Sequence, residues 1–594
     1  MEIEKLKDEL ESLKRELETL PSGYISKKMI QGKIRYYLQW SESGKKKSKY
    51  IGESNVDTIF KQIEHRKEVL KRIKEIESVL PKEQNNEELE NIYQTSVMVG
   101  KDLRSFSDAV ALFKKRKCFV DITSFLYGDI IDRVFILYGL RRTGKTTLIR
   151  QVIREMKEED FKKTAFIQIR RGDTLAAVNA DMKKLQSKGY KYIFIDEVTL
   201  LKDFIDGAAL FSDIFASCGM KIVLSGTDSL GFLFSEDEQL FDRCILLHTT
   251  FIPYREFEEV LGISGIEEYI RFGGTMSLGG IHYNEESTFA TKEKTDDYVD
   301  SAIAKNIQHS LQRYQQAGHF RALLDLYERN ELTSAINRII EDYNHEFTIE
   351  VLTRDFISHD LGVSANNLRR DRTNPTDILD KIDKETFTNC LKELLEIKNK
   401  SEQTIPITEA HRVQIKEYLD LLDLTLDIEK QSILGSVIEK RTVFTQPGMR
   451  YSQAEALIKS LMKESTFKML SLEERKRITE RILSDIKGRM LEDIILLETK
   501  LANKKKNVFK LQFAIGEFDM VISDEENATS KIYEIKHSSK RTSEQCKHLL
   551  DNKKCSDTEF SYGKIIQKVV LYRGETCKEG DIDYINVEEY LKKL

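Results

Sequence analysis

The chain has few cysteines and no long apolar segment. Its 7 cysteines are scattered through 594 residues without a Cys-x-x-Cys pair, which argues against a disulfide framework and favours reduced thiols. Cys546, His548 and Cys555 lack a fourth ligand at a spacing suited to tetrahedral zinc. No apolar run approaches the ~20 residues that a membrane-spanning helix requires, and no signal peptide is recognisable. These absences favour a cytoplasmic protein without a membrane partner.

A strong excess of one charge is also lacking. The net charge of -5 contains no global signal of nucleic-acid binding, so any such surface must be local. The composition, 40% hydrophobic and 32% charged, is ordinary for a soluble and helix-rich protein. A chain of 594 residues is too long for one hydrophobic core, so about three or four domains are expected.

The most specific motif present is a phosphate loop. Residues 139–146 are Gly-Leu-Arg-Arg-Thr-Gly-Lys-Thr and fit G-x-x-x-x-G-K-[ST] at every fixed position. An apolar run at 134–138 predicts a strand before the loop, and residues 147–156 predict a helix after it. Lys145 would reach the β- and γ-phosphates of ATP, and the Thr146 hydroxyl would ligate Mg²⁺. The predicted ATP-binding residues of this segment are Gly139, Arg142, Gly144, Lys145, Thr146 and Thr147.

An acidic pair follows a second predicted strand. The apolar residues 192–195 precede Asp196 and Glu197, and a buried parallel strand with a polar C-terminal end has this pattern. Asp196 is predicted to hold Mg²⁺ through water, and Glu197 to orient or deprotonate the attacking water. A helix cap is the alternative use of two adjacent acids. The apolar run and the upstream phosphate loop argue against it.

Three further segments extend the predicted ATP-binding domain. Residues 165–169 predict a short strand, and 221–224 predict another whose polar end, with Ser225 and Thr227, could sense the γ-phosphate. Arg243 precedes a predicted strand at 244–247 and is either an ATP contact or a salt-bridge partner. The alternation of strands and helices indicates a parallel sheet covered on both faces.

These segments together resemble prokaryotic AAA-type ATPases of archaea and bacteria. The resemblance rests on residues 139–146, the acids after Ile195, the Ser-Gly-Thr at 225–227 and the segment from Arg243 to Phe257. It covers roughly residues 95–280 and implies a P-loop ATPase of the ASCE type, with the phosphate-loop strand next to the sensor strand. It does not identify the substrate on which the ATPase acts.

The N-terminal segment combines two predicted helices with a basic β unit. Apolar residues from 59 to 80 predict one helix, packed antiparallel on a coiled-coil helix before it. Residues 24–50 between the helices contain eight Lys or Arg and one acid, Glu42, and predict a small antiparallel β unit. The segment resembles helix–hairpin–helix modules of some prokaryotic DNA-associated proteins. The coiled-coil spacing is carried by Leu6, Leu10, Leu13, Leu17 and Leu20.

The β unit is the predicted nucleic-acid surface. Lysines can neutralise phosphates, and Tyr or Trp rings can stack on bases. A solvated hairpin whose aromatic residues pack on the helices is the alternative. The predicted DNA contacts are Lys45, Lys46, Lys47, Lys49, Tyr36, Tyr37 and Trp40.

The C-terminal segment contains three charged residues at a spacing that predicts a cation site. Glu534 and Lys536 are two apart in a predicted strand and therefore share a face, while Tyr533 and Ile535 pack opposite. Asp519 lies on the preceding hairpin strand and can join them. Two carboxylates and a lysine at one sheet edge suit a hard divalent cation with an activated water. A structural hairpin with an exposed Glu-x-Lys pair is the alternative.

This arrangement resembles the PD-(D/E)XK nuclease family. Asp519 corresponds to the first acid of the family's motif, Glu534 to the second and Lys536 to its lysine. Glu492, on the preceding helix, corresponds to the extra catalytic acid of resolvase-like members. Phe518 replaces the usual proline before the first acid. The resemblance implies that Asp519 and Glu534 bind Mg²⁺ and that Lys536 orients the nucleophilic water.

We therefore expect an α/β multidomain protein with an AAA-type parallel sheet. The expected function is ATP hydrolysis coupled to work on DNA, with Mg²⁺-dependent cleavage by the C-terminal domain and, by analogy, a role in defence or a mobile element. The alternatives are an ATP-dependent signalling or assembly switch, and a DNA-binding ATPase with an inactive nuclease fold. Homo-oligomers could form through the ATPase domain or the coiled coil. The expected parts are a coiled-coil hairpin with a basic β insert (1–80), a linker (81–94), the ATPase (95–280), a helical lid or connector (281–480) and a restriction-endonuclease-like α/β domain (481–594).

Overall fold

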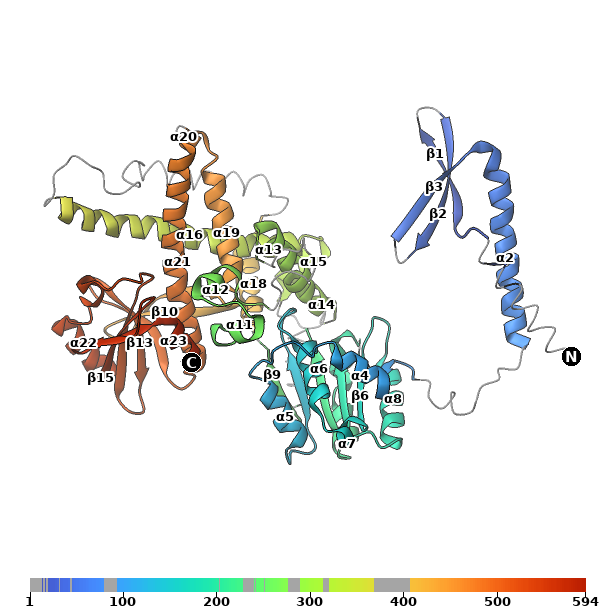
Figure 1. Ribbon diagram of the computed structural model, residues 1–594, viewed down its shortest axis with the longest axis horizontal. Coiled ribbons are helices and arrows are strands. Elements are labelled where there is room, and N and C mark those ends of the chain that lie inside the picture. The colour runs from blue at the N-terminus through green and yellow to red at the C-terminus, as the bar shows by residue number, and fades with distance from the viewer. Residues whose placement is uncertain are drawn as a thin grey trace. The chain divides into compact units, whose positions relative to one another are not determined.

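The computed structural model places the described residues in two units, residues 1–92 and residues 93–594, which are considered separately. Figure 1 shows the elements of each unit. Among the described residues, no helix combines the length and apolarity needed to span a lipid bilayer. The predicted domain boundaries stay predictions, and nearly all of the predicted linker lies outside the described part. The described residues are 13, 16, 17, 20–30, 33–42, 45–79, 93–201, 203–227, 240, 242–249, 251–275, 289–313, 320–367, 406–468 and 470–594.

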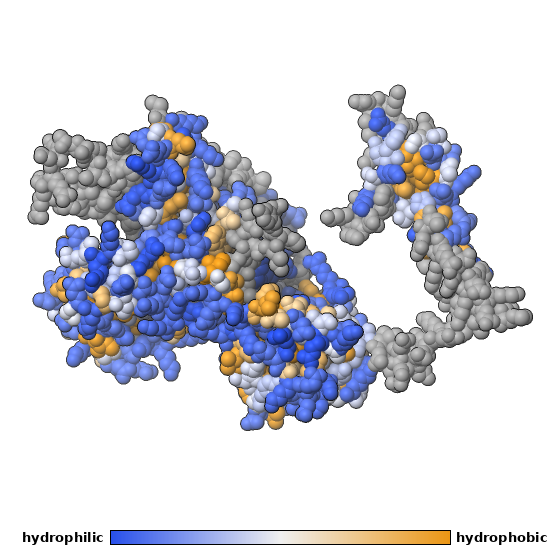
Figure 2. All heavy atoms as spheres, viewed as in Figure 1, coloured by the Kyte–Doolittle hydropathy of each residue, from blue (hydrophilic) through white to orange (hydrophobic). Residues whose placement is uncertain are grey.

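The first unit is a three-stranded antiparallel sheet with a long helix. Ile63, Val69 and Ile73 of α2 are buried, and Arg66 of α2 donates to the Leu20 carbonyl at 2.8 Å. The helix therefore lies beside the end of the predicted leucine repeat, whose first members lie outside the described residues. A space-filling view shows an apolar patch surrounded by hydrophilic residues on this unit (Figure 2). The elements are β1 (Tyr24–Ile30), β2 (Lys33–Glu42), β3 (Lys45–Ile51), η1 (Glu53–Asn55) and α2 (Val56–Val79).

A six-stranded sheet carries the phosphate loop in the second unit. Its strand order is β4-β6-β7-β8-β5-β9, and all neighbours pair in parallel except β4 and β6. The strand before the phosphate loop, β5, lies next to β8, at whose end the predicted sensor residues lie, so the expected neighbour is confirmed. The strands are β4 (Ser96–Met98), β5 (Val134–Tyr138), β6 (Thr164–Gln168), β7 (Tyr192–Asp196), β8 (Lys221–Gly226) and β9 (Cys244–His248).

Helices cover both faces of this sheet, as the alternating pattern predicts. α4, α5 and α6 bury apolar residues on one face, and α8, α9 and η3 cover the other. The central strands β5, β7 and β8 are buried along their whole length, which explains their almost continuous apolar sequence. The helices are α4 (Gly100–Asp108), α5 (Phe119–Tyr127), α6 (Lys145–Glu155), α7 (Glu158–Phe161), α8 (Leu175–Ser187), η2 (Val198–Leu200), α9 (Phe204–Gly207) and η3 (Phe211–Ala216).

Helices follow the sheet, but two strands interrupt the predicted helical connector. β10 (Thr425–Ser432) and β11 (Val437–Phe444) form an antiparallel hairpin, and β10 also pairs in parallel with β12 (Asn507–Gln512). This corrects the prediction of a helical connector over 281–480, because part of that segment completes the C-terminal sheet. The helices are α11 (Tyr254–Leu261), α12 (Ile266–Phe272), α13 (Lys292–Tyr298), η4 (Val299–Ala304), α14 (Lys305–Arg313), α15 (Arg321–Glu328), α16 (Leu332–Asn367), α18 (Glu409–Leu421), α19 (Pro447–Leu461) and α20 (Ser465–Lys468).

An eight-stranded mixed sheet forms the C-terminal part of the second unit, in the order β11-β10-β12-β13-β14-β15-β17-β16. The long helix α21 (Leu472–Ala502) packs on it and begins at a capping box made by Ser471 and Glu474. The predicted strands around Asp519 and Glu534 are confirmed. The remaining elements are β13 (Glu517–Asp524), β14 (Thr529–Ile535), η7 (Ser543–Cys546), α22 (Asn552–Tyr562), β15 (Lys564–Tyr572), β16 (Cys577–Glu579), β17 (Ile582–Asn586) and α23 (Val587–Lys593).

One hydrophobic cluster joins the ATP-binding and C-terminal parts. It contains Phe257 of α11, Tyr269 of α12, Leu491 of α21 and Tyr533 of β14, all of them buried. Figure 1 shows α11 and α12 beside α21 and α23. Because these side chains share one core, the two parts are packed directly on each other.

Candidate nucleotide site and C-terminal carboxylate site

The phosphate loop turns from β5 into α6 through two glycines with left-handed backbone. The φ angle is +139° at Gly139 and +87° at Gly144, values that other residues rarely adopt. A Cβ atom on Gly139 would also lie 2.2 Å from the Thr249 carbonyl oxygen. Thr147 follows in the first turn of α6. Backbone N–H groups in such a loop, at a helix N-terminus, form a site for a polyphosphate.

Lys145 is buried inside this loop. Its Nζ donates to the carbonyl oxygens of Gly139 at 2.8 Å and Leu140 at 2.7 Å. Burial lowers the pKa of its ammonium group to about 8. The ammonium therefore lies among carbonyl groups that a phosphate can replace, and a bound polyphosphate would favour its charged form.

Asp196 accepts hydroxyl groups from two flanking segments. Thr146 Oγ1 donates to Asp196 Oδ2 at 2.8 Å, and Ser225 Oγ donates to Asp196 Oδ1. The three predicted residues therefore lie together, at the start of α6 and the C-terminal ends of β7 and β8. Hydroxyl and carboxylate oxygens are ligands that Mg²⁺ uses beside a nucleotide, so this set of oxygens fits the ion.

Glu197 lies next to Asp196 and is partly buried. Burial and the neighbouring Asp196 raise the pKa of the Glu197 carboxyl group. Thr227 Oγ1 donates to Glu197 Oε2 at 3.3 Å, so the predicted sensor segment contacts the predicted base. A raised pKa suits a carboxylate that takes a proton from water.

Helices of the predicted lid contact the nucleotide site. Arg141 Nη1 donates to the Ser301 carbonyl of η4 at 3.3 Å, and the Arg142 guanidinium lies 5.4 Å from the centroid of the Tyr298 ring. Asn306 of α14 donates from Nδ2 to the Thr227 carbonyl. Sequence analysis missed Asn306, and no motif marks it. Through these contacts η4 and α14 reach both the phosphate loop and the sensor segment.

Arg116 is a buried residue of this site that sequence analysis also missed. Its guanidinium donates to the Thr143 carbonyl in the phosphate loop at 3.0 Å and to the Phe251 carbonyl at 3.2 Å. It also pairs with Glu256 of α11 at 2.8 Å. The two partners are 140 residues apart, so no local pattern could find the pair.

Arg243 does not lie at the nucleotide site of its own chain. Its carbonyl accepts the Val134 N–H at the start of β5, whereas the phosphate loop follows the other end of that strand. Arg243 Nη1 pairs with Asp213 Oδ2 at 3.0 Å. Arg243 therefore does not contact ATP bound to its own chain, which corrects that prediction. Its ion pair with Asp213 corresponds to the salt-bridge alternative.

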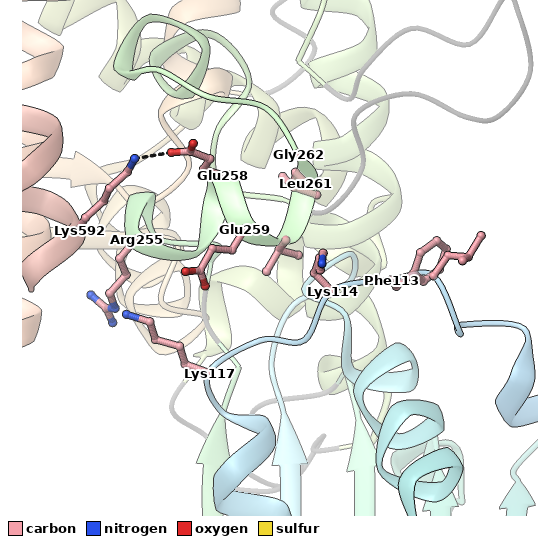
Figure 3. A pocket seen from close by; sticks show the side chains of 11 residues that line it. Phe113, Lys114, Lys117, Arg255, Glu258, Glu259, Leu261, Gly262 and Lys592 are labelled. Carbon is pink, nitrogen blue, oxygen red and sulfur yellow. Dashed lines mark ion pairs between the residues drawn. The ribbon is translucent and has the colours of Figure 1, made fainter.

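α11 connects the nucleotide site to the C-terminal part. Lys592 of α23 pairs with Glu258 of α11 beside a pocket of about 690 Å³, into which Lys117 and Arg255 also extend (Figure 3). On α21, Glu498 Oε1 accepts the Tyr254 N–H at 2.7 Å. The Tyr269 hydroxyl donates to the same oxygen at 3.0 Å. Helices α11 and α12 are therefore fixed to α21 through one buried carboxyl group.

The Glu498 contact predicts a pH-dependent stability. Burial raises the pKa of Glu498 to about 7 from an ordinary 4.5, so the folded protein binds a proton that the unfolded chain releases. The free energy of unfolding should fall by up to about 1.4 kcal/mol per pH unit as pH rises between these values. Glu498→Gln should remove this slope in urea titrations, whereas Glu473→Gln at the exposed start of α21 should keep it. Equal slopes in the wild type and Glu498→Gln would contradict the assignment.

Asp519, Glu534 and Lys536 meet in one pocket of about 710 Å³. Lys536 Nζ lies 3.0 Å from Asp519 Oδ2 and 2.7 Å from Glu534 Oε2, and both carboxylates are buried. The Ile535 N–H donates to Asp519 Oδ2 at 2.8 Å. Tyr533 and Ile535 pack in the hydrophobic cluster on the other side of the strand, as predicted. The structure therefore brings the three predicted residues together.

Glu492 lines the same pocket, but two cations hold its carboxylate. Lys510 Nζ lies 2.7 Å from Glu492 Oε2, and Arg489 pairs with the same oxygen. Burial alone would raise the pKa of Glu492, but Lys510 and Arg489 hold it well below its usual range. Sequence analysis missed Lys510, because a buried lysine within an apolar strand carries no motif.

The Asp519 and Glu534 carboxylates fit a divalent cation. Glu534 Oε1 is buried and has no hydrogen-bond partner among the described residues. Burial and the nearby Asp519 raise the pKa of Glu534 well above its usual range, and a cation would offset both effects. In the described part of the chain no group of three His, Cys, Asp or Glu side chains is placed to hold a metal ion. The ligands of a cation beyond Asp519 and Glu534 would therefore be water, backbone or substrate oxygens.

The predicted DNA contacts of the first unit divide between the two faces of its sheet. Tyr37 pairs with Tyr50 across β2 and β3, and their ring centroids lie 5.7 Å apart. The strand pairing puts Tyr36 on the opposite face, together with the exposed Lys47 and Lys49. The remaining predicted contacts lie on the same two strands and are Trp40, Lys45 and Lys46. Tyr37 therefore does not share a face with Tyr36, Lys47 and Lys49.

Comparisons with known proteins agree with the geometry of the nucleotide site. Residues 132–258 match the family model described as an AAA domain, and residues 3–61 match that of a domain of unknown function, DUF6788. A curated relative, the uncharacterized protein MJ1544 of Methanocaldococcus jannaschii, is 24% identical over 245 residues. The match covers 38% of this chain and 53% of the relative, so the chain spans about half the length of the curated relative it matches. With the loop and acid pair described above, residues 132–258 form a P-loop ATPase domain of the AAA type.

Proposed function

We propose that the chain hydrolyses ATP and couples this to Mg²⁺-dependent cleavage of DNA. The observation that carries the nuclease part is the convergence of Asp519, Glu534 and Lys536 in one pocket, where one buried Glu534 oxygen has no hydrogen-bond partner in the described part of the chain. The nucleotide part is supported by the loop around Lys145 and by the contact between Asp196 and Thr146.

The proposed ATP hydrolysis assigns a role to each residue of the nucleotide site. The phosphate loop and Lys145 bind the β- and γ-phosphates, while Asp196 and Thr146 supply the oxygens for Mg²⁺. Glu197 orients the attacking water and receives its proton, and Thr227 positions the Glu197 carboxylate. Water adds to the γ-phosphorus, the bond to the β-phosphate oxygen breaks, and ADP and phosphate leave.

The proposed DNA cleavage uses the C-terminal pocket. Asp519 and Glu534 would hold Mg²⁺, which would supply a Lewis acid for the scissile phosphate and the attacking water. Lys536, between the two carboxylates, orients that water and offsets negative charge on the phosphate. Lys510 and Arg489 keep Glu492 charged beside the site. Water adds to the phosphorus as one P–O ester bond breaks, so that one DNA end keeps the phosphate and the other leaves as a hydroxyl that has taken up the proton of the water.

Direct packing between the two parts supports coupling. Arg116 connects the phosphate loop to Glu256 of α11, and Glu498 connects α11 and α12 to α21, the helix that also carries Glu492. The basic sheet of the first unit would hold DNA near the chain, with Lys47 and Lys49 on its phosphates. We expect a cytoplasmic protein that acts on DNA and assembles as a homo-oligomer.

The experiment that tests the nuclease part is incubation of the purified chain with plasmid, linear and branched DNA. We expect cleavage of at least one substrate with Mg²⁺ or Mn²⁺ and none with EDTA, each measured with and without ATP. Absence of cleavage of every substrate in both metals would leave the ATPase assignment intact. It would overturn the nuclease assignment in favour of a DNA-binding ATPase or a switch.

A further inference from the structure

A second groove, of about 600 Å³, lies beside the carboxylate pocket. The two share Arg489, Glu492 and Lys536, so they meet at the predicted catalytic lysine. The groove runs along α21 and the loop that follows β14. Its Lys and Arg side chains are Arg481, Arg489, Lys536, Lys540 and Arg573.

The two neighbouring sites differ in charge. The groove is lined by five Lys or Arg side chains, three serines and two carboxylates, Asp485 and Glu492. The carboxylate pocket is lined by five acids and three Lys or Arg side chains. An acidic pocket attracts a cation, whereas cations interleaved with hydroxyl groups bind phosphate oxygens. The groove therefore has the chemistry of a phosphate site next to a metal site.

One carboxylate from the ATP-binding side already occupies the edge of this groove. Glu267 of α12 lies 2.7 Å from His537 Nε2 and 2.7 Å from Arg573 Nη1 through Oε1, and 2.7 Å from Lys487 Nζ through Oε2. His537 and Lys487 lower the pKa of Glu267 to about 2, so the carboxylate is charged throughout the neutral range. Three N–H groups around one anion are the arrangement that a phosphate would also use.

We propose that this groove binds the phosphate backbone of the nucleic-acid strand next to the scissile phosphate, and that Glu267 limits its affinity by occupying its Arg573 and His537 end. The inference rests on the proposed nuclease function, whose substrate strand it positions. Lys540 is exposed on the loop after β14 and would contact one phosphate. Because Glu267 belongs to α12, the packing of α12 on α21 sets how much of the groove is open.

Two variants should shift DNA affinity in opposite directions. Lys540→Met removes a phosphate contact, so DNA should bind about three- to tenfold more weakly, with a slope of log affinity against log salt reduced by roughly 0.7 to 0.9. Glu267→Gln keeps the side-chain size but removes the negative charge that pairs with Arg573 and His537. DNA should therefore bind more tightly, with a steeper slope of log affinity against log salt. Binding is measured by fluorescence anisotropy of labelled DNA in EDTA, where metal-dependent cleavage does not interfere. Lys531→Met on β14 and Glu259→Gln on α11 are matched controls outside the groove, expected to behave as the wild type.

The outcomes separate this inference from the nuclease assignment. Opposite shifts in the two variants would support the groove even if no DNA is cleaved. Wild-type affinity and slope in both variants would overturn it even if the chain cleaves DNA, and so would an absence of DNA binding by the wild type. If Glu267→Gln fails to fold, Glu267→Asp and the exposed Lys540→Met still test the groove. The aspartate variant should then bind DNA no more weakly than the wild type, and Lys540→Met should bind it more weakly.

Discussion

Replacement of Lys145 by alanine should abolish ATP hydrolysis. The ammonium is buried against the loop carbonyls, where it would neutralise the β- and γ-phosphates. We expect turnover to fall by at least about 100-fold, the loss typical when one preorganised charge is removed from a transition state. Nucleotide affinity should fall as well. The measurement is phosphate release together with nucleotide binding, and the matched control is Lys162→Ala, at an exposed lysine directly after α7.

Glu197→Gln should separate binding from hydrolysis at the same site. The glutamine keeps the size of the side chain and its contact with Thr227 but cannot take a proton from water. We expect ATP to bind with wild-type affinity and turnover to fall by about 100-fold or more, so that the protein accumulates in the ATP-bound state. Turnover at the wild-type rate in Glu197→Gln would show that another group is the base. Glu259→Gln, an exposed acid on α11, should behave as the wild type.

Changes at the C-terminal pocket should remove DNA cleavage and leave ATP turnover intact. Glu534→Gln removes a proposed metal ligand, and Lys536→Met removes the ammonium that lies between Asp519 and Glu534. Each should lower the cleavage rate by about 100-fold or more. ATP hydrolysis measured without DNA should stay at the wild-type rate, because these residues do not contact the phosphate loop.

Lys531→Met is the control for Lys536→Met, because Lys531 lies on β14, which ends one residue before Lys536, and does not line the pocket. Metal-dependent cleavage that persists at the wild-type rate in Glu534→Gln would exclude the pocket as the nuclease site. Loss of ATP turnover in Lys536→Met would instead indicate that the variant has lost the packing that joins the two parts.

Residues that are close in sequence were predictable. The spacing within 139–146 places Lys145 and Thr146 on one loop whatever the rest of the chain does, because backbone geometry fixes the turn. The two-residue spacing of Glu534 and Lys536 likewise fixes a shared strand face. The placement of the phosphate-loop strand next to the sensor strand followed from the family resemblance and not from any residue pattern.

Contacts between distant segments could not be predicted in the same way. The pair Arg116 and Glu256 is formed across 140 residues, and Lys510 meets Glu492 only because α21 packs on β12. The hairpin of β10 and β11 was not predicted, because its strands are only half-buried and lie inside a mostly helical segment. Pairing of β10 with β12, which lies far along the chain, stabilises it. The sequence could not decide between an ATP contact and a salt bridge for Arg243, because its place relative to the phosphate loop depends on the register of β9 on β5.

The coupling of the two sites is the central claim, and the rate of DNA cleavage as a function of ATP concentration tests it most directly. The measurement uses the full chain in Mg²⁺, with Lys145→Ala and Glu197→Gln beside the wild type. The account predicts that ATP changes the cleavage rate of the wild type, that Glu197→Gln responds to ATP without consuming it, and that Lys145→Ala does not respond. Cleavage that is the same in all three proteins at every ATP concentration would contradict the account, because two sites packed on one core would then act independently.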